Sequence, residues 1–197
     1  MTVDFGKTKL KIGFSFFLVA ALMLLLADGK IAIMCFLSSI AHEAGHLLPM
    51  FAFSQRVRLI SFGAFGVRIE CEGESLQSYK RGAIVSLGGV AVNFMICAVS
   101  LCVSAVYKKT DAAVLFFVNF FIAALNLMPA KSLDAWNALY CVLMTRRGEE
   151  KTLKILSRVS LFAVVLFGGF CAVYFFLFGF NVSLSAVFIY LIFLEFK

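Results

Sequence analysis

The sequence is built mainly of apolar stretches long enough to cross a lipid bilayer as helices. An α-helix needs about 20 mostly apolar residues to span the hydrocarbon core. Stretches that reach or approach this length are Leu10–Ala27, Ile31–Phe53, Gly82–Tyr107, Ala112–Met128, Val159–Phe178 and Val182–Phe196. We therefore predict an all-α polytopic membrane protein with about six transmembrane helices, forming a single domain over residues 1–197.

The composition excludes several other classes of protein. Residues of the set AVILMFWYC make up 62% of the chain and charged residues 15%, against about 45–50% and about 25% in an average soluble domain. One soluble core cannot hold such an excess, and intrinsic disorder and a disulfide scaffold do not fit it either. The net charge of +7 does not indicate nucleic-acid binding, because basic residues beside apolar spans usually set membrane topology.

Lysine and arginine are distributed unevenly between the two sides that the spans define. One side holds both termini and the loops Ser54–Arg81 and Pro129–Arg158, and it carries 15 of the 18 Lys and Arg. The other 3 lie in tight turns, at Lys30, Lys108 and Lys109. The positive-inside rule therefore predicts a multi-pass protein of the cell membrane with both termini in the cytoplasm.

The two long loops carry some structure of their own. Val57–Phe62 and Val67–Glu70 are β-prone runs separated by Gly63–Gly66, which predicts a β-hairpin. Its apolar face suggests that it lies against the membrane or dips into the helical bundle, although a hairpin that merely connects helices is an equal alternative. In the second loop, the charged stretch Met144–Arg158 predicts a solvated helical connector.

The motif that carries chemistry is His42-Glu43-Ala44-Gly45-His46, in the middle of the second span. Two histidines four residues apart share one face of a helix, so their imidazoles can converge on one zinc ion. Glu43 can accept a proton from water held by that zinc. The alternative is a pair of satisfied polar residues used for helix packing. Because ionisable residues at bilayer depth are costly and usually functional, we predict a zinc site.

A catalytic zinc site normally has a third protein ligand besides two histidines. Asp28 and Asp111 lie on the opposite side of the membrane, and Glu149 and Glu150 belong to a solvated charge cluster. Asp134 follows the fourth span, where Pro129 interrupts the helix and frees backbone groups that need a cavity or protein around them. Asp134 is therefore the best candidate for the third ligand.

These motifs together resemble the signature of a known family. His-Glu-x-x-His in one transmembrane helix, followed by Asn126-x-x-Pro129-x-x-x-Leu133-Asp134 at the end of a later one, resembles the site-2 protease family of intramembrane zinc metalloproteases. Gly89-Val90-Ala91-Val92-Asn93 is similar to the family's third signature. The resemblance covers a core of residues 31–137, with additional helices over 159–196. The span number and the hairpin are similar to the sporulation-factor protease branch, and the loops are too short for a regulatory domain.

The resemblance implies a role for each matching residue. The implied zinc ligands are His42, His46 and Asp134, with Glu43 as the catalytic acid/base. The implied substrate-binding residues, which include the hairpin segment that would pair with an extended substrate strand, are Asn93, Asn126, Phe62, Gly63 and Gly66. Asn93 could instead hydrogen-bond across helices without a catalytic part, and Asn126 could be a plain residue at a helix C-terminus.

The sequence departs from the family next to the third ligand. The family usually continues Leu-Asp-Gly-Gly, whereas this chain has Leu133-Asp134-Ala135-Trp136. Loss of both glycines stiffens the backbone at this point. The site is then either reshaped for an unusual substrate or weakened.

The predicted function is that of an intramembrane zinc metalloendopeptidase cleaving a transmembrane or membrane-associated protein. Such cleavage would release a signalling factor to the cytoplasm or remove leftover signal peptides. The expected partners are a membrane-protein substrate, the lipid bilayer and a membrane regulator protein, and nucleic acid is not among them. The alternatives are a non-proteolytic zinc-binding membrane protein, such as a transporter or scaffold, and an inactive protease homologue.

Overall fold

The computed structural model describes backbone and side chains of residues 28–54 and 79–196. For residues 2–5, 8–12, 57–63 and 66–71 it describes the strands that their backbone forms. The chain forms two compact units, the first made of Met1–Gln77 and Gly88–Ala123 and the second of Ser78–Leu87 and Ala124–Lys197. The single-domain organisation over residues 1–197 stays a prediction.

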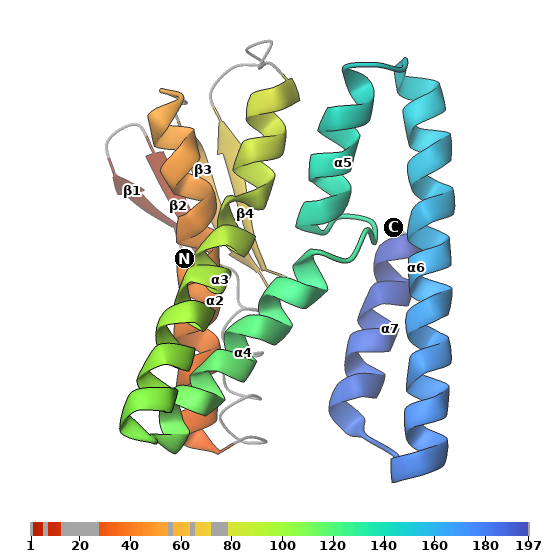
Figure 1. Cartoon of the computed structure of the whole chain (residues 1–197). Helices are drawn as coiled ribbons and strands as arrows, with labels where there is room; N and C mark the ends of the chain where they lie inside the picture. The colour runs from red at the N-terminus through yellow and green to blue at the C-terminus, as the bar shows by residue number, and fades with distance from the viewer. Residues whose placement is uncertain are drawn as a thin grey trace. The chain divides into compact units, whose positions relative to one another are not determined.

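The first unit contains a four-stranded sheet (Figure 1). Its strands follow one another in the order β1 (Thr2–Phe5), β2 (Thr8–Ile12), β3 (Val57–Gly63) and β4 (Gly66–Cys71). β3 and β4 pair antiparallel, with Gly63 opposite Gly66, at the residues for which the sequence predicts a hairpin. β2 pairs with β3 in parallel and β1 with β2 antiparallel. An all-α fold with one hairpin was therefore too narrow a prediction, and the location of the sheet at the membrane stays a prediction.

Helix α2 (Gly29–Ala52) and most of α3 (Tyr79–Tyr107) and α4 (Thr110–Asn126) belong to the first unit. Their bounds agree with the predicted second, third and fourth spans to within three residues. α2 begins directly after Asp28, whose carboxylate accepts a hydrogen bond of 2.8 Å from the Lys30 amide and so caps the helix. The predicted first span, Leu10–Ala27, starts within β2, and its residues 13–27 lie outside the described residues.

The second unit contains α5 (Asp134–Met144), α6 (Glu149–Phe178) and α7 (Val182–Phe196). α6 and α7 form a helical hairpin (Figure 1) that turns at Gly179, where φ is +87°. A core of buried side chains joins them to the segment before α5: Ala130, Leu133, Val164, Leu191 and Leu194. The predicted helical character of the connector Met144–Arg158 is confirmed from Glu149 onward, where it forms the first part of α6, and α6 continues through the whole predicted fifth span.

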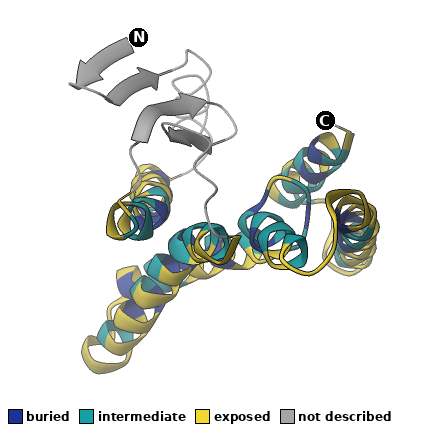
Figure 2. Cartoon of the chain, turned by 90° about the horizontal axis from the view of Figure 1, so that it is seen from above, coloured by how far each residue is buried: buried dark blue, intermediate teal, exposed yellow. Residues whose placement is uncertain are grey.

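Three of the described helices, α2, α3 and α6, are long and apolar enough to cross a membrane, and α4 and α7 are shorter apolar helices. Exposed residues line every described helix (Figure 2), and among them are large aromatic side chains such as Phe162 and Phe176, which are 69% and 89% exposed. Apolar exposure on this scale is unfavourable in water but natural in lipid. The chain is therefore a membrane protein.

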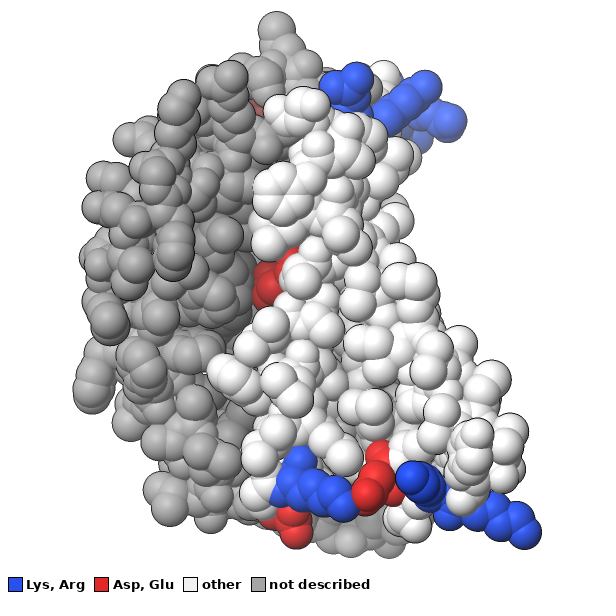
Figure 3. Space-filling view, turned by 90° about the vertical axis from the view of Figure 1, so that its left-hand side faces the viewer, with Lys and Arg blue, Asp and Glu red and all other residues white. Residues whose placement is uncertain are grey.

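In Figure 3, Lys and Arg side chains lie at the upper end of the view, and most of the surface below them is uncharged. Charged side chains of both signs gather at the lower end, where α2 begins and α3 and α4 meet (Figure 3). At this end the ammonium group of Lys30 lies 2.7 Å from the carboxylate of Asp111, and both side chains are exposed. An exposed pair of this kind adds about 1 kcal/mol at most. The ion pair does show that the turns that contain Lys30 and Asp111, which the sequence places on one side of the membrane, lie at the same end of this unit.

Candidate metal centre

The histidine pair of the centre lies where glycines of α2 and α3 bring the two backbones into close contact. A Cβ atom added at Gly45 would lie 2.6 Å from the carbonyl oxygen of Gly88 and 2.8 Å from the Cα of Gly89. Only glycine therefore fits at this crossing, since small residues are what allow the backbones of two membrane helices to touch. The contact presses the face of α2 that carries the histidines against α3.

His42 and His46 form a closely spaced pair on that face. Both are buried, with exposed fractions of 5% and 9%, and their Nε2 atoms lie 3.3 Å apart. Two nitrogens bound to one tetrahedral zinc ion at about 2.0–2.1 Å would be roughly 3.3–3.4 Å apart. Gly89 leaves the room for this pair, because a Cβ there would lie 2.6 Å from His46 Nε2 and 2.8 Å from His42 Nε2.

The other ring nitrogen of His42 is held by a buried amide. His42 Nδ1 lies 2.6 Å from Asn93 Oδ1, and Asn93 Nδ2 donates a hydrogen bond of 2.8 Å to Asn119 Oδ1. Because the Asn93 amino group faces Asn119, the oxygen facing His42 can only accept, and Nδ1 of His42 must carry the proton. This assignment leaves the Nε2 lone pair for a metal, with the opposite ring nitrogen oriented by a carbonyl oxygen, as in most protein metal sites.

Asn93 thus takes part in the centre through His42. Its side chain is fully buried, with 0% exposed, which favours the alternative that it hydrogen-bonds across helices over a direct contact with substrate. Sequence reasoning missed its partner, Asn119, which is also 0% exposed. The available signal was an amide in the middle of the apolar α4, since such a group needs a partner in a membrane.

We expect Asn93→Leu to weaken zinc binding by about 10- to 100-fold, because partners of metal-bound histidines contribute on that scale. Ser100→Ala is the matched control, since it removes a buried hydroxyl of the same helix that bonds to carbonyls of that helix, and it should keep the affinity within a few-fold of wild type. Competition between the purified protein and a fluorescent zinc chelator measures both. Equal affinities for Asn93→Leu and wild type would show that the amide has no part in the centre.

Asp134 stands at the start of α5 in the second unit, after a turn in which Ser132 has a φ of +69°. The turn is anchored on α6, because the Lys131 amide donates a hydrogen bond of 2.9 Å to Ser160 Oγ. The Ser160 hydroxyl in turn donates to the carboxylate of Glu195 on α7. α6 and α7 therefore both hold the backbone from which Asp134 projects.

Helix formation accounts for the departure from the glycine pair after Asp134. Ala135 and Trp136 occupy the first turn of α5, where any residue adopts the backbone conformation without strain. Ala135 is buried, and the Trp136 indole stacks on Tyr140 one turn later, with ring centroids 5.8 Å apart and planes 6° apart. The bulky side chain therefore packs along its own helix.

His42 and His46 each offer an imidazole nitrogen to a metal ion, and Asp134, in the second unit, offers a carboxylate oxygen. Two imidazole nitrogens and one carboxylate oxygen form a donor set that zinc accepts in catalytic sites, with the fourth position left for water. Glu43 follows His42 on α2 and is half-buried. The spacing of the histidine pair fits two zinc ligands, while the complete ligand set with Asp134 stays a prediction.

The remaining predicted site residues belong to α4 and to the β3–β4 pair. Asn126 is the last residue of α4 and is half-buried. Phe62 pairs with Val67, and Gly63 with Gly66, at the closed end of the β3–β4 pair. Only the strand register is described there, so contacts of the Phe62 side chain are outside the described part of the chain. The substrate-binding role of these residues stays a prediction.

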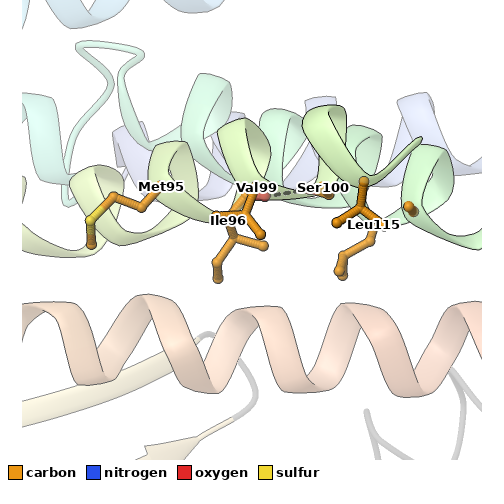
Figure 4. Close-up of a pocket in the computed structure, with 7 residues that line it drawn as sticks. Met95, Ile96, Val99, Ser100 and Leu115 are labelled. Atoms are coloured by element: carbon orange, nitrogen blue, oxygen red, sulfur yellow. Dashed lines mark hydrogen bonds between the residues drawn. The ribbon is translucent and has the colours of Figure 1, made fainter. Parts of the chain in front are cut away.

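A cavity of about 300 Å³ lies on α3 and α4 of the first unit (Figure 4). The residues that line it are Met95, Ile96, Val99, Ser100, Val103, Ala112 and Leu115. Its one hydroxyl, on Ser100, donates to the Ile96 carbonyl of its own helix (Figure 4). These lining residues include no titratable side chain, so this cavity is not a candidate catalytic site.

Comparison with solved structures places this architecture among known proteins. The chain is similar to the site-2 protease from Methanocaldococcus jannaschii, with a TM-score of 0.67 and 19% sequence identity, over 99% of this chain and 93% of that chain. The fold is that of a site-2 protease. No family model and no curated protein sequence matches the chain. The site-2 protease fold agrees with the predicted resemblance, while the sporulation-factor branch stays a prediction.

Proposed function

We propose that the protein is an intramembrane zinc metalloendopeptidase that cleaves a transmembrane or membrane-associated protein. The observation that carries this proposal is the buried histidine pair of a His-Glu-x-x-His motif on a membrane-length helix, with Nε2 atoms at the spacing of two zinc ligands. Asp134 is proposed as the third ligand. The site-2 protease fold supports the same class of enzyme.

Each part of the proposed site has its own role in catalysis. Bound zinc would supply a Lewis acid that polarises the scissile carbonyl. The carboxylate of Glu43 takes a proton from the attacking water and delivers it to the leaving amine. His42 is kept in one orientation by Asn93, so the ligands do not have to reorganise during the reaction.

A transmembrane substrate has to unwind before cleavage, because a helical peptide bond is shielded by its own hydrogen bonds. We propose that the unwound segment adds as a strand to the sheet near Phe62, Gly63 and Gly66. In the described sheet β3 is flanked by β2 and β4, so the substrate strand would pair with β4, which lies at an edge. Asn126 is proposed to hold the substrate backbone.

The proposed location and orientation in the membrane follow from the distribution of Lys and Arg along the sequence. A multi-pass protein in the cell membrane with both termini in the cytoplasm has 15 of its 18 Lys and Arg on the cytoplasmic side. Cleavage in that half of the membrane would release a signalling factor inward or remove leftover signal peptides. The proposed partners are the membrane-protein substrate, the surrounding lipid and a membrane regulator protein.

Reconstitution tests the proposal. The purified protein is placed in liposomes with a panel of single-span proteins that carry glycine or proline in the cytoplasmic half of the span. We expect cleavage of at least one of them, loss of cleavage with a zinc chelator and recovery when zinc is added back. Metal analysis should give one zinc per chain. Zinc binding without cleavage of any substrate would favour a non-proteolytic protein, and absence of zinc would remove the basis of the proposal.

A further inference from the structure

We propose that Asn119 is a positioning residue that fixes the tautomer of His42, and that the backbone carbonyl of Leu115 sets the direction of the hydrogen bonds between them. The consequence for metal binding rests on the proposed function. The tautomer itself does not, because it can be measured in the metal-free protein.

The inference starts from a buried circuit of hydrogen bonds through three helices. It runs from His42 on α2 to Asn93 on α3 and on to Asn119 on α4. Asn119 Nδ2 then donates a hydrogen bond of 2.9 Å to Ser38 Oγ, back on α2. Ser38 and His42 are four residues apart, on the same face of their helix, and Ser38 is only 3% exposed. The circuit therefore begins and ends on the helix that carries the zinc motif.

The direction of the circuit is decided at α4. Asn119 Nδ2 also donates a hydrogen bond of 2.9 Å to the Leu115 carbonyl, one turn earlier on the same helix. A backbone carbonyl can only accept, so the amino group of Asn119 has to face Leu115. The oxygen of Asn119 then faces α3 and requires a donor there. In contrast, the Ser38 hydroxyl can donate or accept and imposes no direction.

This requirement passes along the circuit to the histidine. Asn93 has to present its amino group to Asn119 Oδ1, and it therefore presents its oxygen to His42. His42 Nδ1 must then be the protonated nitrogen of the neutral ring, and Nε2 keeps its lone pair. If the Asn119 amide were reversed, each step would reverse with it, and the proton of His42 would sit on the nitrogen that faces His46.

A simpler alternative is that the same four side chains only tie three helices together. That role would not depend on the direction of any hydrogen bond. It predicts that Asn119→Leu and Ser38→Ala change stability without a specific effect on His42. The proposed role instead predicts a difference between these two variants, because only Asn119 is held by an obligatory acceptor.

The test is nitrogen NMR of the full-length protein in detergent micelles, labelled with ¹⁵N-histidine and stripped of metal. The chain has 2 histidines, so two ring systems are observed, and a His46→Gln variant assigns them. In the wild type we expect His42 protonated at Nδ1 and unprotonated at Nε2. In Asn119→Leu we expect a mixture of both tautomers. Ser38→Ala should keep the wild-type tautomer, because the Leu115 carbonyl still orients Asn119.

Binding of Co²⁺ or Zn²⁺ provides the second readout. We expect the affinity of Asn119→Leu to fall by about tenfold or more and that of Ser38→Ala to change much less. Ser100→Ala is the matched control, because it removes a buried hydroxyl of α3 that bonds to carbonyls of its own helix. A wild-type His42 protonated at Nε2 would overturn the proposal, whatever happens to the variants. So would a tautomer that is unchanged in Asn119→Leu or equally disturbed in Ser38→Ala.

These outcomes are distinct from failure of the proposed function. If the wild type binds no metal and cleaves no substrate, the zinc protease proposal fails, but the NMR result on metal-free protein still decides the role of Asn119.

Discussion

Glu43→Gln should abolish peptide hydrolysis while leaving zinc binding unchanged. Glutamine has nearly the same size as glutamate but cannot take a proton from the attacking water. Loss of a general base typically costs 10²- to 10⁴-fold in rate, so cleavage in liposomes should fall by about that factor. The zinc content, measured by metal analysis on the same preparation, should stay at the wild-type value because the proposed ligands are His42, His46 and Asp134.

The matched control is Glu150→Gln, which neutralises an exposed carboxylate paired with Lys154 on the surface of α6. We expect this variant to cleave at the wild-type rate. If Glu43→Gln cleaved as fast as the control, Glu43 would not be the catalytic acid/base. A transporter or scaffold that merely holds zinc has no need of Glu43, so its function would survive the substitution. The pair of variants therefore separates the protease from its main alternative.

A single methyl group at Gly89 should eliminate metal binding. The Cβ of Gly89→Ala would meet His46 Nε2 at 2.6 Å and His42 Nε2 at 2.8 Å, closer than carbon and nitrogen atoms normally pack. The two imidazoles would have to move away from the position in which they share one ion. We expect a loss of zinc affinity greater than the roughly 100-fold upper end for changes in outer-shell partners, together with loss of cleavage.

Gly169→Ala on α6 is the control for this prediction, because a Cβ at that position meets no atom within 4 Å. Replacing a helical glycine by alanine otherwise stabilises a helix by about 1 kcal/mol, so Gly169→Ala should be at least as stable as wild type and bind zinc normally. Chelator competition and thermal unfolding measure both quantities. Normal zinc binding by Gly89→Ala would show that the histidine nitrogens do not meet beside Gly89.

The helices were largely predictable because their signal is local. The stretch Val182–Phe196 has the bounds of α7, and the predicted second span differs from α2 by two residues at its start and one at its end. Length and apolarity suffice for such predictions. The motif around His42 was equally local, because a spacing of four residues on a helix puts both rings on one face.

The N-terminal strands could not be predicted in the same way. Thr8–Ile12 alternates basic and apolar residues, as a strand does, but lysines before an apolar run are equally typical of the cytoplasmic flank of a span. Only the pairing of β2 with β3, which is distant in sequence, decides between these interpretations. Asn119 was missed for a related reason. A polar residue in an apolar helix indicates that a partner exists, but which helix supplies it depends on packing.

The order of the strands has a consequence for how the chain is made on the ribosome. β2 ends at Ile12 and β3 begins at Val57, so α2 lies within the connection between two parallel neighbours. Parallel strands require such a crossover, and β2 cannot find β3 until the whole of α2 has been synthesised. Completion of the sheet therefore follows synthesis of the helix that carries the histidines. Because β1 lies at an edge of the sheet, a fusion partner attached before Thr2 would also lie at that edge.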